Sequence, residues 1–413
     1  MIAIGISHKT SSLKIREKFC LDPIERELLL SELKNEPSVV EALVLSTCNR
    51  TEIYAHVLSA DPEILFETLF KVKKINPDLI LNAACESPIS VSLRGAFFAT
   101  KQSFKKIASR KAFAMTPSDK NSHTKLILKN HFYFYSGREV VYHLMQVAAG
   151  LDSLVIGEKQ ILGQIKDSIE LSRKKGMMGK YFNILTNMAI RAGKKARAET
   201  QIDCGGSSVS WAAVEMAQKI LGSLQDKSVL IIGAGKMSSL AASHLKKKGV
   251  SQIYVINRTC EKAMELARQF GGQVVSFLDI KNILEKVDVC ICSAGAPHYL
   301  IEEDIIEEIM PKRIGKKLVL IDISVPRNIN PAVASLKDVF LMAVDDLKNV
   351  VDGNLNKRQM AIQAVEMIIA QKVEEFYEKL SQNILRSTTA SSNAQEKSAR
   401  EAHRMAPSYG KSH

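Results

Sequence analysis

The chain has 413 residues, 46% of them hydrophobic and 24% charged, which excludes a fibre or a largely disordered chain and predicts two or three globular domains. No apolar run approaches the roughly 18 residues that a membrane span needs, and the first residues read as a strand without a signal peptide, so a cytoplasmic location is expected. The net charge is +13, and residues 1–200 hold 30 basic against 20 acidic side chains; this predicts a polyanionic partner on one side of the molecule, although a lysine-rich solvated surface explains the charge equally well.

In the first part of the chain, residues 2–6 and 39–45 have the apolar pattern of short strands, and residues 14–34 between them have helical spacing. A polar turn follows the second strand and precedes an alternating segment at 53–57 that predicts a further strand. Cys48 is therefore expected on a loop between two strands. From Glu139 to about Thr200 the spacing of apolar residues is helical.

Further along, short apolar runs predict strands at 228–232, 252–257, 288–292 and 318–323, and helical segments alternate with them. Such alternation predicts a doubly wound parallel sheet, the Rossmann type of fold. Apolar residues at steps of three and four from Asp345 to about Leu385 predict a helix of some 60 Å, too long to fold back on one small core, so a dimerisation helix is expected. The polar segment 386–413 is predicted to be a disordered tail.

A glycine-rich turn follows the strand at 228–232 and opens a helix, which is the context of a dinucleotide-binding loop. Gly233 permits the tight turn, and Gly235 lets a pyrophosphate approach the positive end of the helix. Ser238 stands where the general fingerprint has a third glycine, so a slightly different helix packing is expected. The predicted cofactor loop is Gly233, Ala234, Gly235, Lys236, Met237 and Ser238.

The strand after that helix ends in Asn257-Arg258-Thr259, where an NAD site would carry a carboxylate for the ribose 2′-hydroxyl. An arginine there suits a 2′-phosphate through charge-assisted hydrogen bonds, so NADPH is the predicted cofactor. The alternative is that Arg258 only solvates the end of a strand.

Seven cysteines at scattered positions do not form zinc-type pairs and predict free thiols and no metal site. Cys48 is unusual because Asn49 and Arg50 follow it in a polar turn, whereas structural cysteines have apolar neighbours. Arg50, together with His143 if the fold brings it near, is expected to favour the thiolate and make Cys48 a nucleophile; an inert loop thiol is the alternative. The remaining six are interpreted as packing residues: Cys20, Cys85, Cys204, Cys260, Cys290 and Cys292.

Four blocks of the sequence, together with the glycine-rich loop, resemble the glutamyl-tRNA reductase family in content and order. The blocks are Gly5-Ile-Ser-His-Lys-Thr10 with Arg16-Glu17, Ser46-Thr-Cys-Asn-Arg-Thr-Glu-Ile-Tyr54, Ala149-Gly-Leu-Asp-Ser-Leu-Val-Ile-Gly-Glu-Lys-Gln-Ile-Leu-Gly-Gln164 and Asp322-Ile-Ser-Val-Pro-Arg-Asn-Ile-Asn-Pro331. The resemblance implies NADPH-dependent reduction of glutamyl-tRNA to glutamate-1-semialdehyde, the first step of porphyrin biosynthesis from glutamate, through a thioester on Cys48.

The resemblance also implies the remaining site residues and the layout of the chain. His143 matches a histidine associated with activity, whose catalytic or structural role is open. The implied glutamate-binding positions are Thr47, Asn49, Arg50, Ser153, Glu158, Lys159, Gln160 and Gln164, with Lys159 in place of the commoner proline. Bidentate pairing of Arg50 with the substrate carboxylate is expected. The implied layout is a V-shaped homodimer, which a downstream aminomutase can join, with a catalytic α+β domain at 1–150, a connecting long helix at 151–200, a Rossmann domain at 201–325 and a helical dimerisation domain at 326–385.

A basic segment at about 78–130 has no counterpart in the family pattern. Residues 91–131 within it hold nine basic side chains and one acidic one, interleaved with phenylalanines. It is expected either to contact tRNA phosphates or to be a lysine-rich surface loop. The alternative function for the whole chain is a non-catalytic, NADPH-responsive RNA-binding scaffold, against which stands the presence of Cys48, Arg50, Glu158 and Gln164 together.

Overall fold

The N-terminal domain is built on a four-stranded antiparallel sheet. The computed structural model describes residues 1–59, 61–74, 130–200, 202, 208–347 and 359–383. The strands lie in the order β2-β3-β1-β4 and are β1 (Ile2–Ser7), β2 (Val39–Ser46), β3 (Arg50–Val57) and β4 (Tyr133–Ser136). The strands predicted at 2–6, 39–45 and 53–57 are confirmed. Apart from residue 130, the basic segment at 78–130 lies outside the described residues, as does the tail at 386–413.

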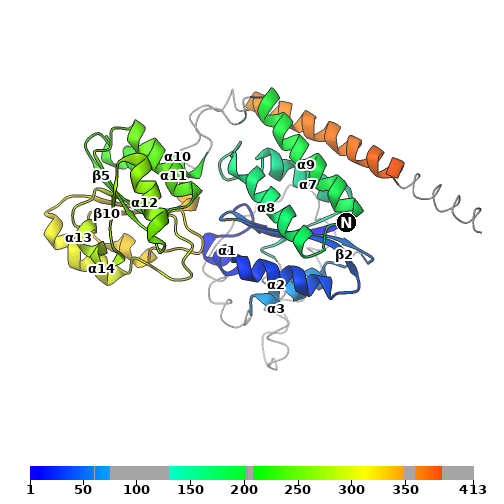
Figure 1. Cartoon of the computed structure of the whole chain (residues 1–413), viewed down its shortest axis with the longest axis horizontal. Helices are drawn as coiled ribbons and strands as arrows, with labels where there is room; N and C mark the ends of the chain where they lie inside the picture. The colour runs from blue at the N-terminus through cyan, green and yellow to red at the C-terminus, as the bar shows by residue number, and fades with distance from the viewer. Residues whose placement is uncertain (60, 75–129, 201, 203–207, 348–358, 384–413) are drawn as a thin grey trace, which may run out of the picture.

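Helices cover both faces of this sheet, because alternate residues of each strand point to opposite sides. Ile2, Ile4 and Ile6 of β1 are buried against α1 (Leu13–Phe19), α2 (Pro23–Lys34) and α3 (Glu63–Val72). Ala3 lies in the core on the other side, with α7 (Arg138–Ala149), α8 (Gln160–Lys174) and α9 (Lys180–Glu199). Figure 1 shows the sheet between these two helical layers.

The single helix expected over 14–34 is two helices, because the chain changes direction between Phe19 and Pro23. Asp22 accepts a hydrogen bond from the Glu25 backbone and Glu25 returns one to the Asp22 backbone, a capping box that begins α2. Pro23 suits the first helical position, where no backbone donor is needed. Ile24 is consequently exposed rather than buried in a continuous apolar face.

The segment 151–200, expected as one connecting helix, contains two helices that belong to the N-terminal domain. α8 and α9 pack with α7 in a common core. At Gly193 a β-carbon would lie 2.5 Å from the carbonyl oxygen of Ala148, so α9 approaches α7 more closely than any other residue would permit. Residues 151–200 therefore do not form one long connecting helix.

The second domain is a six-stranded parallel sheet, which confirms the predicted doubly wound fold. The strand order is β10-β9-β8-β5-β6-β7. The strands are β5 (Ser228–Ile232), β6 (Gln252–Ile256), β7 (Gln273–Val274), β8 (Val289–Cys292), β9 (Leu318–Asp322) and β10 (Val339–Ala343). Helices α10 (Val209–Leu221), α11 (Lys236–Lys247) and α12 (Cys260–Phe270) cover one face, and α13 (Ile280–Leu284) and α14 (Glu303–Ile309) cover the other.

The C-terminal helix occupies residues 359–383 and packs against the N-terminal domain of its own chain (Figure 1). Its buried residues Val365, Ile369, Val373 and Phe376 share a core with α7 and α9. The expectation that this helix is too long to fold back on one small core was wrong for residues 359–383, because the core formed by α7 and α9 extends beneath them. Residues 344–347, at the start of the predicted helix, form a 3-10 turn, and no described helix has the length and apolar character of a membrane span.

Candidate active site

A tight loop between β2 and β3 presents Cys48, as the sequence predicted. The hydroxyl oxygen of Thr47 accepts hydrogen bonds from the backbone N–H groups of Asn49 and Arg50, both at 3.2 Å. The Thr47 N–H in turn donates to the Arg50 carbonyl at 2.8 Å. These bonds reverse the chain within four residues and leave Cys48 at the tip of the turn, half-buried.

The guanidinium of Arg50 is almost fully buried and has two carboxylate partners. Its Nη1 donates to Glu52 Oε1 at 2.8 Å and to Asp152 Oδ2 at 2.7 Å, and its Nη2 donates to the Asp152 carbonyl. Lys9 adds a further ion pair to Asp152. A substrate carboxylate that uses Arg50 must therefore share it with these two acids.

Glu52 organises the groups on the other side of Arg50. His143, buried on α7, lies with Nε2 2.8 Å from Glu52 Oε1, and the hydroxyl of Tyr54 donates to Oε2 at 2.7 Å. The hydroxyl of Tyr133 also donates to Oε1. Burial alone would raise the pKa of Glu52, but Arg50 and His143 outweigh it and hold that pKa well below its usual range. His143 is thus oriented by Glu52.

Three groups in this network could hold a metal ion by distance alone. Ligand atoms of Glu52, His143 and Asp152 lie within 4.8 Å of one another in the described part of the chain. Both carboxylates already accept hydrogen bonds from Arg50, whose positive charge occupies the place a cation would take. We therefore assign no metal here.

The surroundings of Cys48 favour the neutral thiol, which differs from the expectation of a thiolate. Burial, Glu158 and Cys20 raise the pKa of Cys48 to about 12, and Arg16 opposes them only in part. The charge of Arg50 is taken up by Glu52 and Asp152, and His143 is bound to Glu52. Neither therefore stabilises the sulfur anion as the sequence suggested.

Glu158 is the titratable group best suited to exchange a proton near the thiol. Its side chain is buried in the segment between α7 and α8, and burial raises its pKa to about 7, although Arg50 and Arg197 counteract part of the effect. A carboxyl group with such a pKa is partly ionised at neutral pH and can both accept and return a proton.

The other predicted glutamate-binding residues lie around the start of α8. Ser153 is buried, Lys159 is the exposed N-cap residue of α8, and Gln164 is half-buried one turn after Gln160. Among the described residues, two buried polar atoms of the predicted set have no hydrogen-bond partner, Oδ1 of Asn49 and Nε2 of Gln160. One is an acceptor and the other a donor, so both remain available to a polar ligand.

The sequence patterns do not indicate the side chains that hold the predicted residues in place. Asp152, Glu52 and Lys9 lie inside the quoted motifs but were not singled out, and Tyr133 was not identified at all. A signal was present at Glu52, an acid directly before the predicted strand 53–57, because a charge that a strand buries needs a partner. No local signal marks Tyr133, whose ring occupies the space that a side chain at Gly5 would fill.

The glycine-rich loop fits a dinucleotide phosphate. Gly233 has φ of +111°, and a β-carbon there would lie 2.9 Å from the backbone of Ser293, so only glycine suits the turn. A β-carbon at Gly235 would project into open space in front of α11, where the first N–H groups of the helix are unpaired by the helix itself. Ser238 is fully buried, and its hydroxyl lies 2.6 Å from that of Ser293, which ties α11 to the end of β8.

The residues predicted to contact a 2′-phosphate lie in the turn after β6. Arg258 is exposed and makes no ion pair among the described residues. Asn257 donates from its amide nitrogen to the Thr259 carbonyl at 2.9 Å, which shapes the turn that carries Arg258.

Three contacts hold the second domain against α1 and the residue that follows it. Arg16 donates to both oxygens of Asp345 at 2.9 and 3.1 Å, and Arg327 donates to both oxygens of Glu17 at 2.7 and 3.0 Å. Cys20 donates from its sulfur to the Val325 carbonyl at 3.4 Å. Cys20 is thus a contact residue between domains.

The structure also shows where the other cysteines lie. Cys290 and Cys292 are core residues as predicted, and Cys260 is exposed contrary to prediction. Cys85 and Cys204 lie outside the described residues.

Comparisons with known proteins agree with the two-domain division. The family model "Glutamyl-tRNAGlu reductase, N-terminal domain" matches residues 4–200, and the model "Shikimate / quinate 5-dehydrogenase" matches residues 215–350. The glutamyl-tRNA reductase of Bacillus pumilus is 37% identical over 376 residues, which are 91% of this chain and 72% of that protein. The glutamyl-tRNA reductase of Trichlorobacter lovleyi is 38% identical over 377 residues, 91% and 76% of the two chains. The structure of glutamyl-tRNA reductase from Methanopyrus kandleri is 28% identical, covering 98% of this chain and 86% of that one with a TM-score of 0.48.

Proposed function

The chain belongs to the glutamyl-tRNA reductase family, and from this premise we propose that it reduces the glutamyl group of glutamyl-tRNA to glutamate-1-semialdehyde and releases the tRNA, with NADPH as reductant. The product of such a reaction enters porphyrin biosynthesis. The observation that carries the proposal is the Cys48 thiol at the tip of a tight loop, near a buried carboxyl group whose pKa lies close to neutrality.

In the first step the sulfur of Cys48 attacks the carbonyl carbon of the glutamyl ester. A carbon–sulfur bond forms, the bond to the ribose oxygen breaks, and the glutamyl group remains on the enzyme as a thioester. Because the pKa of Cys48 is raised, its proton must leave during the attack, and Glu158 is suited to accept it. Glu158 can then return that proton to the departing ribose oxygen.

When bound, NADPH supplies the hydride that reduces the glutamyl group carried by Cys48. We assign the pyrophosphate to the loop from Gly233 to Ser238, where Gly235 leaves open space in front of α11. Arg258 supports the choice of NADPH over NADH, because it is an exposed cation at the end of β6 where no carboxylate is found. After reduction the carbon–sulfur bond breaks, the aldehyde leaves, and the sulfur of Cys48 takes up a proton.

The glutamyl group has a free amino group and a carboxylate, so its pocket needs acceptors and donors. The unpaired atoms of Asn49 and Gln160 support a place for it beside Cys48, with Thr47, Arg50, Ser153, Lys159 and Gln164 as further candidates. For His143 we propose a positioning role through Glu52, since their 2.8 Å contact fixes the ring.

The test is incubation of the protein with glutamyl-tRNA and NADPH, with aldehyde formation as the measurement. We expect aldehyde from the wild type and none from Cys48→Ser. Without NADPH the wild type should release free glutamate slowly as the thioester hydrolyses. Cys260→Ser is the matched control, because that thiol is exposed in the second domain, and it should leave turnover unchanged. Aldehyde from Cys48→Ser at the wild-type rate would refute the assignment.

The resemblance to the family also supports a homodimer, a cytoplasmic location and an encounter with the aminomutase that consumes the aldehyde. Within the described residues, Met360 and Met367 of the helix 359–383 remain 73% and 69% exposed after its apolar stripe is buried, and they are the candidates for contact with a second copy. Sedimentation of the wild type and of Met360→Lys/Met367→Lys checks this, since only the variant should be monomeric.

A further inference from the structure

A groove between α8 and α9 has the chemistry of a phosphate-backbone site, and we propose that it binds the sugar-phosphate strand of the tRNA. This inference rests on the proposed function, because it assumes that a tRNA presents its acylated end to Cys48. The groove has a volume of about 530 Å³. Its lining residues are Lys166, Ile169, Glu170, Arg173, Lys174, Thr186, Asn187 and Ile190.

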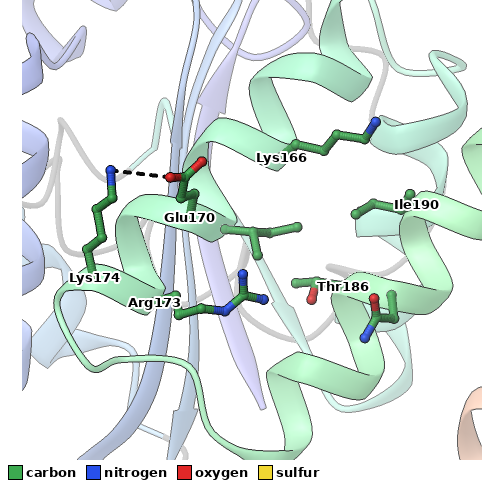
Figure 2. Close-up of a pocket in the computed structure, with 8 residues that line it drawn as sticks. Lys166, Glu170, Arg173, Lys174, Thr186 and Ile190 are labelled. Carbon is green, nitrogen blue, oxygen red and sulfur yellow. Dashed lines mark ion pairs between the residues drawn. The ribbon is translucent and has the colours of Figure 1, made fainter.

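The groove holds uncompensated positive charge. In Figure 2 the side chains of Lys166 and Arg173 extend from α8 toward α9, whereas Lys174 turns to the other side, where a dashed line joins it to Glu170. The distance between Lys174 Nζ and Glu170 Oε1 is 3.3 Å, so the acidic residue that lines the groove is already paired. Lys166 and Arg173 are exposed and make no ion pair with any residue that the structure describes. The groove therefore presents two free cations.

The surrounding helices are the source of much of the excess charge of the chain. Residues 160–199 carry nine lysines and arginines against three acids, a net charge of +6 within a total of +13. On α9, Arg191 and Lys194 follow Asn187 at steps of four and three, so they continue its exposed stripe, and they too lack ion-pair partners among the described residues. Unpaired cations that are concentrated on one pair of helices attract a polyanion such as a nucleic acid.

Both helices lead from the groove to the candidate active site. α8 begins at Gln160, two residues after Glu158, and Lys166 and Arg173 lie about 9 and 20 Å further along its axis. Near the far end of α9, Arg197 donates to the Glu158 carbonyl at 2.7 Å. A strand whose terminal ribose is at Cys48 can thus reach the groove within a few nucleotides.

The spacing of the two cations also suits a nucleic acid. Lys166 and Arg173 are separated by seven residues, or about 10 Å along α8. A single strand carries one charge per roughly 3.4 Å of helix axis, so the two cations match phosphates about three steps apart. The amide of Asn187, exposed on the opposite wall, can add a hydrogen bond to a phosphate or ribose oxygen.

The experiment measures the affinity of the full chain for uncharged glutamate-accepting tRNA as a function of salt. Each phosphate contact contributes about 0.7–0.9 to the slope of log affinity against log salt. Lys166→Gln/Arg173→Gln should lower the magnitude of the slope by about 1.4–1.8. Across a fourfold rise in salt the wild type should therefore lose about ten times more affinity than the variant. The control Lys262→Gln/Lys286→Gln removes the same charge from exposed positions of the second domain and should leave the slope unchanged.

A second variant guards against a folding defect. Glu170→Gln removes the acid that lines the groove and should raise the affinity and steepen the slope, a gain that misfolding cannot produce. Equal slopes for the groove variant and the wild type, or an equal loss in the control, would overturn the inference. Aldehyde formation is scored in parallel. If the wild type makes aldehyde while the groove variants leave the slope unchanged, only the groove assignment fails; if the slopes change but no aldehyde forms, only the proposed reaction fails.

Discussion

Arg50 and Asp152 are joined twice, by a hydrogen bond of 2.7 Å between Nη1 and Oδ2 and by a second from Nη2 to the Asp152 carbonyl. The two residues are 102 positions apart, and their contact fastens the loop that carries Cys48 to the segment after α7. Burial opposes the charge of Asp152, but Arg50 and Lys9 outweigh it and lower the pKa of the carboxyl group. The reactive loop is thus held in place by an ion pair of very low exposure.

Removal of the Asp152 carboxylate should destabilise the N-terminal domain and slow turnover. Breaking a buried ion pair from one side costs at most about 3 kcal/mol here, because Arg50 loses one of its two carboxylate partners and keeps Glu52. We expect Asp152→Ala to lower the free energy of unfolding by about that amount in a urea titration. Glu308→Ala, which removes an acid from fully exposed ion pairs of the second domain, is the control and should leave the midpoint where it was.

Substitution of Glu158 by glutamine should stabilise the protein at alkaline pH while abolishing turnover. The folded-state pKa of about 7 lies above the ordinary 4.5, so the folded protein retains this proton more strongly than the unfolded chain does. Ionisation of Glu158 consequently removes stability as pH rises from about 4.5 through 7, up to about 3 kcal/mol. Glu158→Gln carries no such penalty. At pH 8 the urea concentration at the unfolding midpoint should be higher for Glu158→Gln than for the wild type, and this difference should vanish near pH 4.5.

The same residue predicts the pH dependence of catalysis. If ionised Glu158 accepts the thiol proton, the rate of thioester formation should rise with pH through about 7. Single-turnover release of tRNA measures this step. Glu307→Gln, an exposed acid on α14, should keep both the wild-type profile and the wild-type stability. A flat profile in the wild type would exclude Glu158 as the base.

Two glycines in neighbouring helices should respond in opposite directions to alanine. At Gly193 the new β-carbon would meet the Ala148 carbonyl at 2.5 Å and force α9 away from α7, at a cost of about 1–3 kcal/mol. Gly163 in α8 has nothing within 4 Å of such a carbon, so alanine there should add about 0.5–1 kcal/mol through helix propensity. Thermal unfolding of the two variants decides the point, and two shifts of the same sign would contradict it.

Arg258→Ala should weaken NADPH selectively. Loss of a guanidinium that pairs with a 2′-phosphate should raise the KM for NADPH by about tenfold or more, which corresponds to about 1.4 kcal/mol of binding free energy. The KM for NADH, which has no 2′-phosphate, should stay unaltered. Arg268→Ala is the matched control, since Arg268 is also exposed but lies at the end of α12 that is remote from the turn carrying Arg258. Equal effects on both cofactors would show that Arg258 acts on folding rather than on the phosphate.

We expect the bidentate pair between Glu17 and Arg327 to influence whether the glutamyl thioester is reduced to the aldehyde or hydrolysed to glutamate. Its two hydrogen bonds of 2.7 and 3.0 Å help to hold the second domain beside α1. With Glu17→Gln we expect a larger share of the thioester to end as free glutamate and a smaller share as aldehyde. The charge exchange Glu17→Arg/Arg327→Glu should restore part of the wild-type ratio, whereas an unchanged ratio in Glu17→Gln would remove the pair from this role.

The elements that sequence predicted well are those defined by local pattern. The strands of the parallel sheet are short apolar runs, and the Cys48 loop is a polar turn between two of the predicted strands. The break at Asp22-Pro23 also had a local signal, since an Asp-x-x-Glu capping box with proline at the first helical position can be read from the letters.

What sequence did not predict depends on partners that are distant along the chain. Nothing near Arg50 indicates that Asp152 will neutralise it, so a free guanidinium and an ionised thiol were expected. Likewise, the apolar stripe of the helix 359–383 has the same spacing whether it meets its own chain or another, and only the core of α7 and α9 shows which surface covers it. Pattern selects the candidate residues, but their charge states depend on tertiary contacts.

The short helix α1 and the residues after it are attached on both sides. Arg16, Glu17 and Cys20 hold the second domain, and Leu21 donates from its backbone to the Ser46 hydroxyl, at the base of the loop that carries Cys48, at 3.0 Å. The contacts of the second domain and those of the loop that carries Cys48 therefore meet on one short segment. The position of the second domain and the orientation of the Cys48 loop thus depend on the same six residues, Arg16–Leu21.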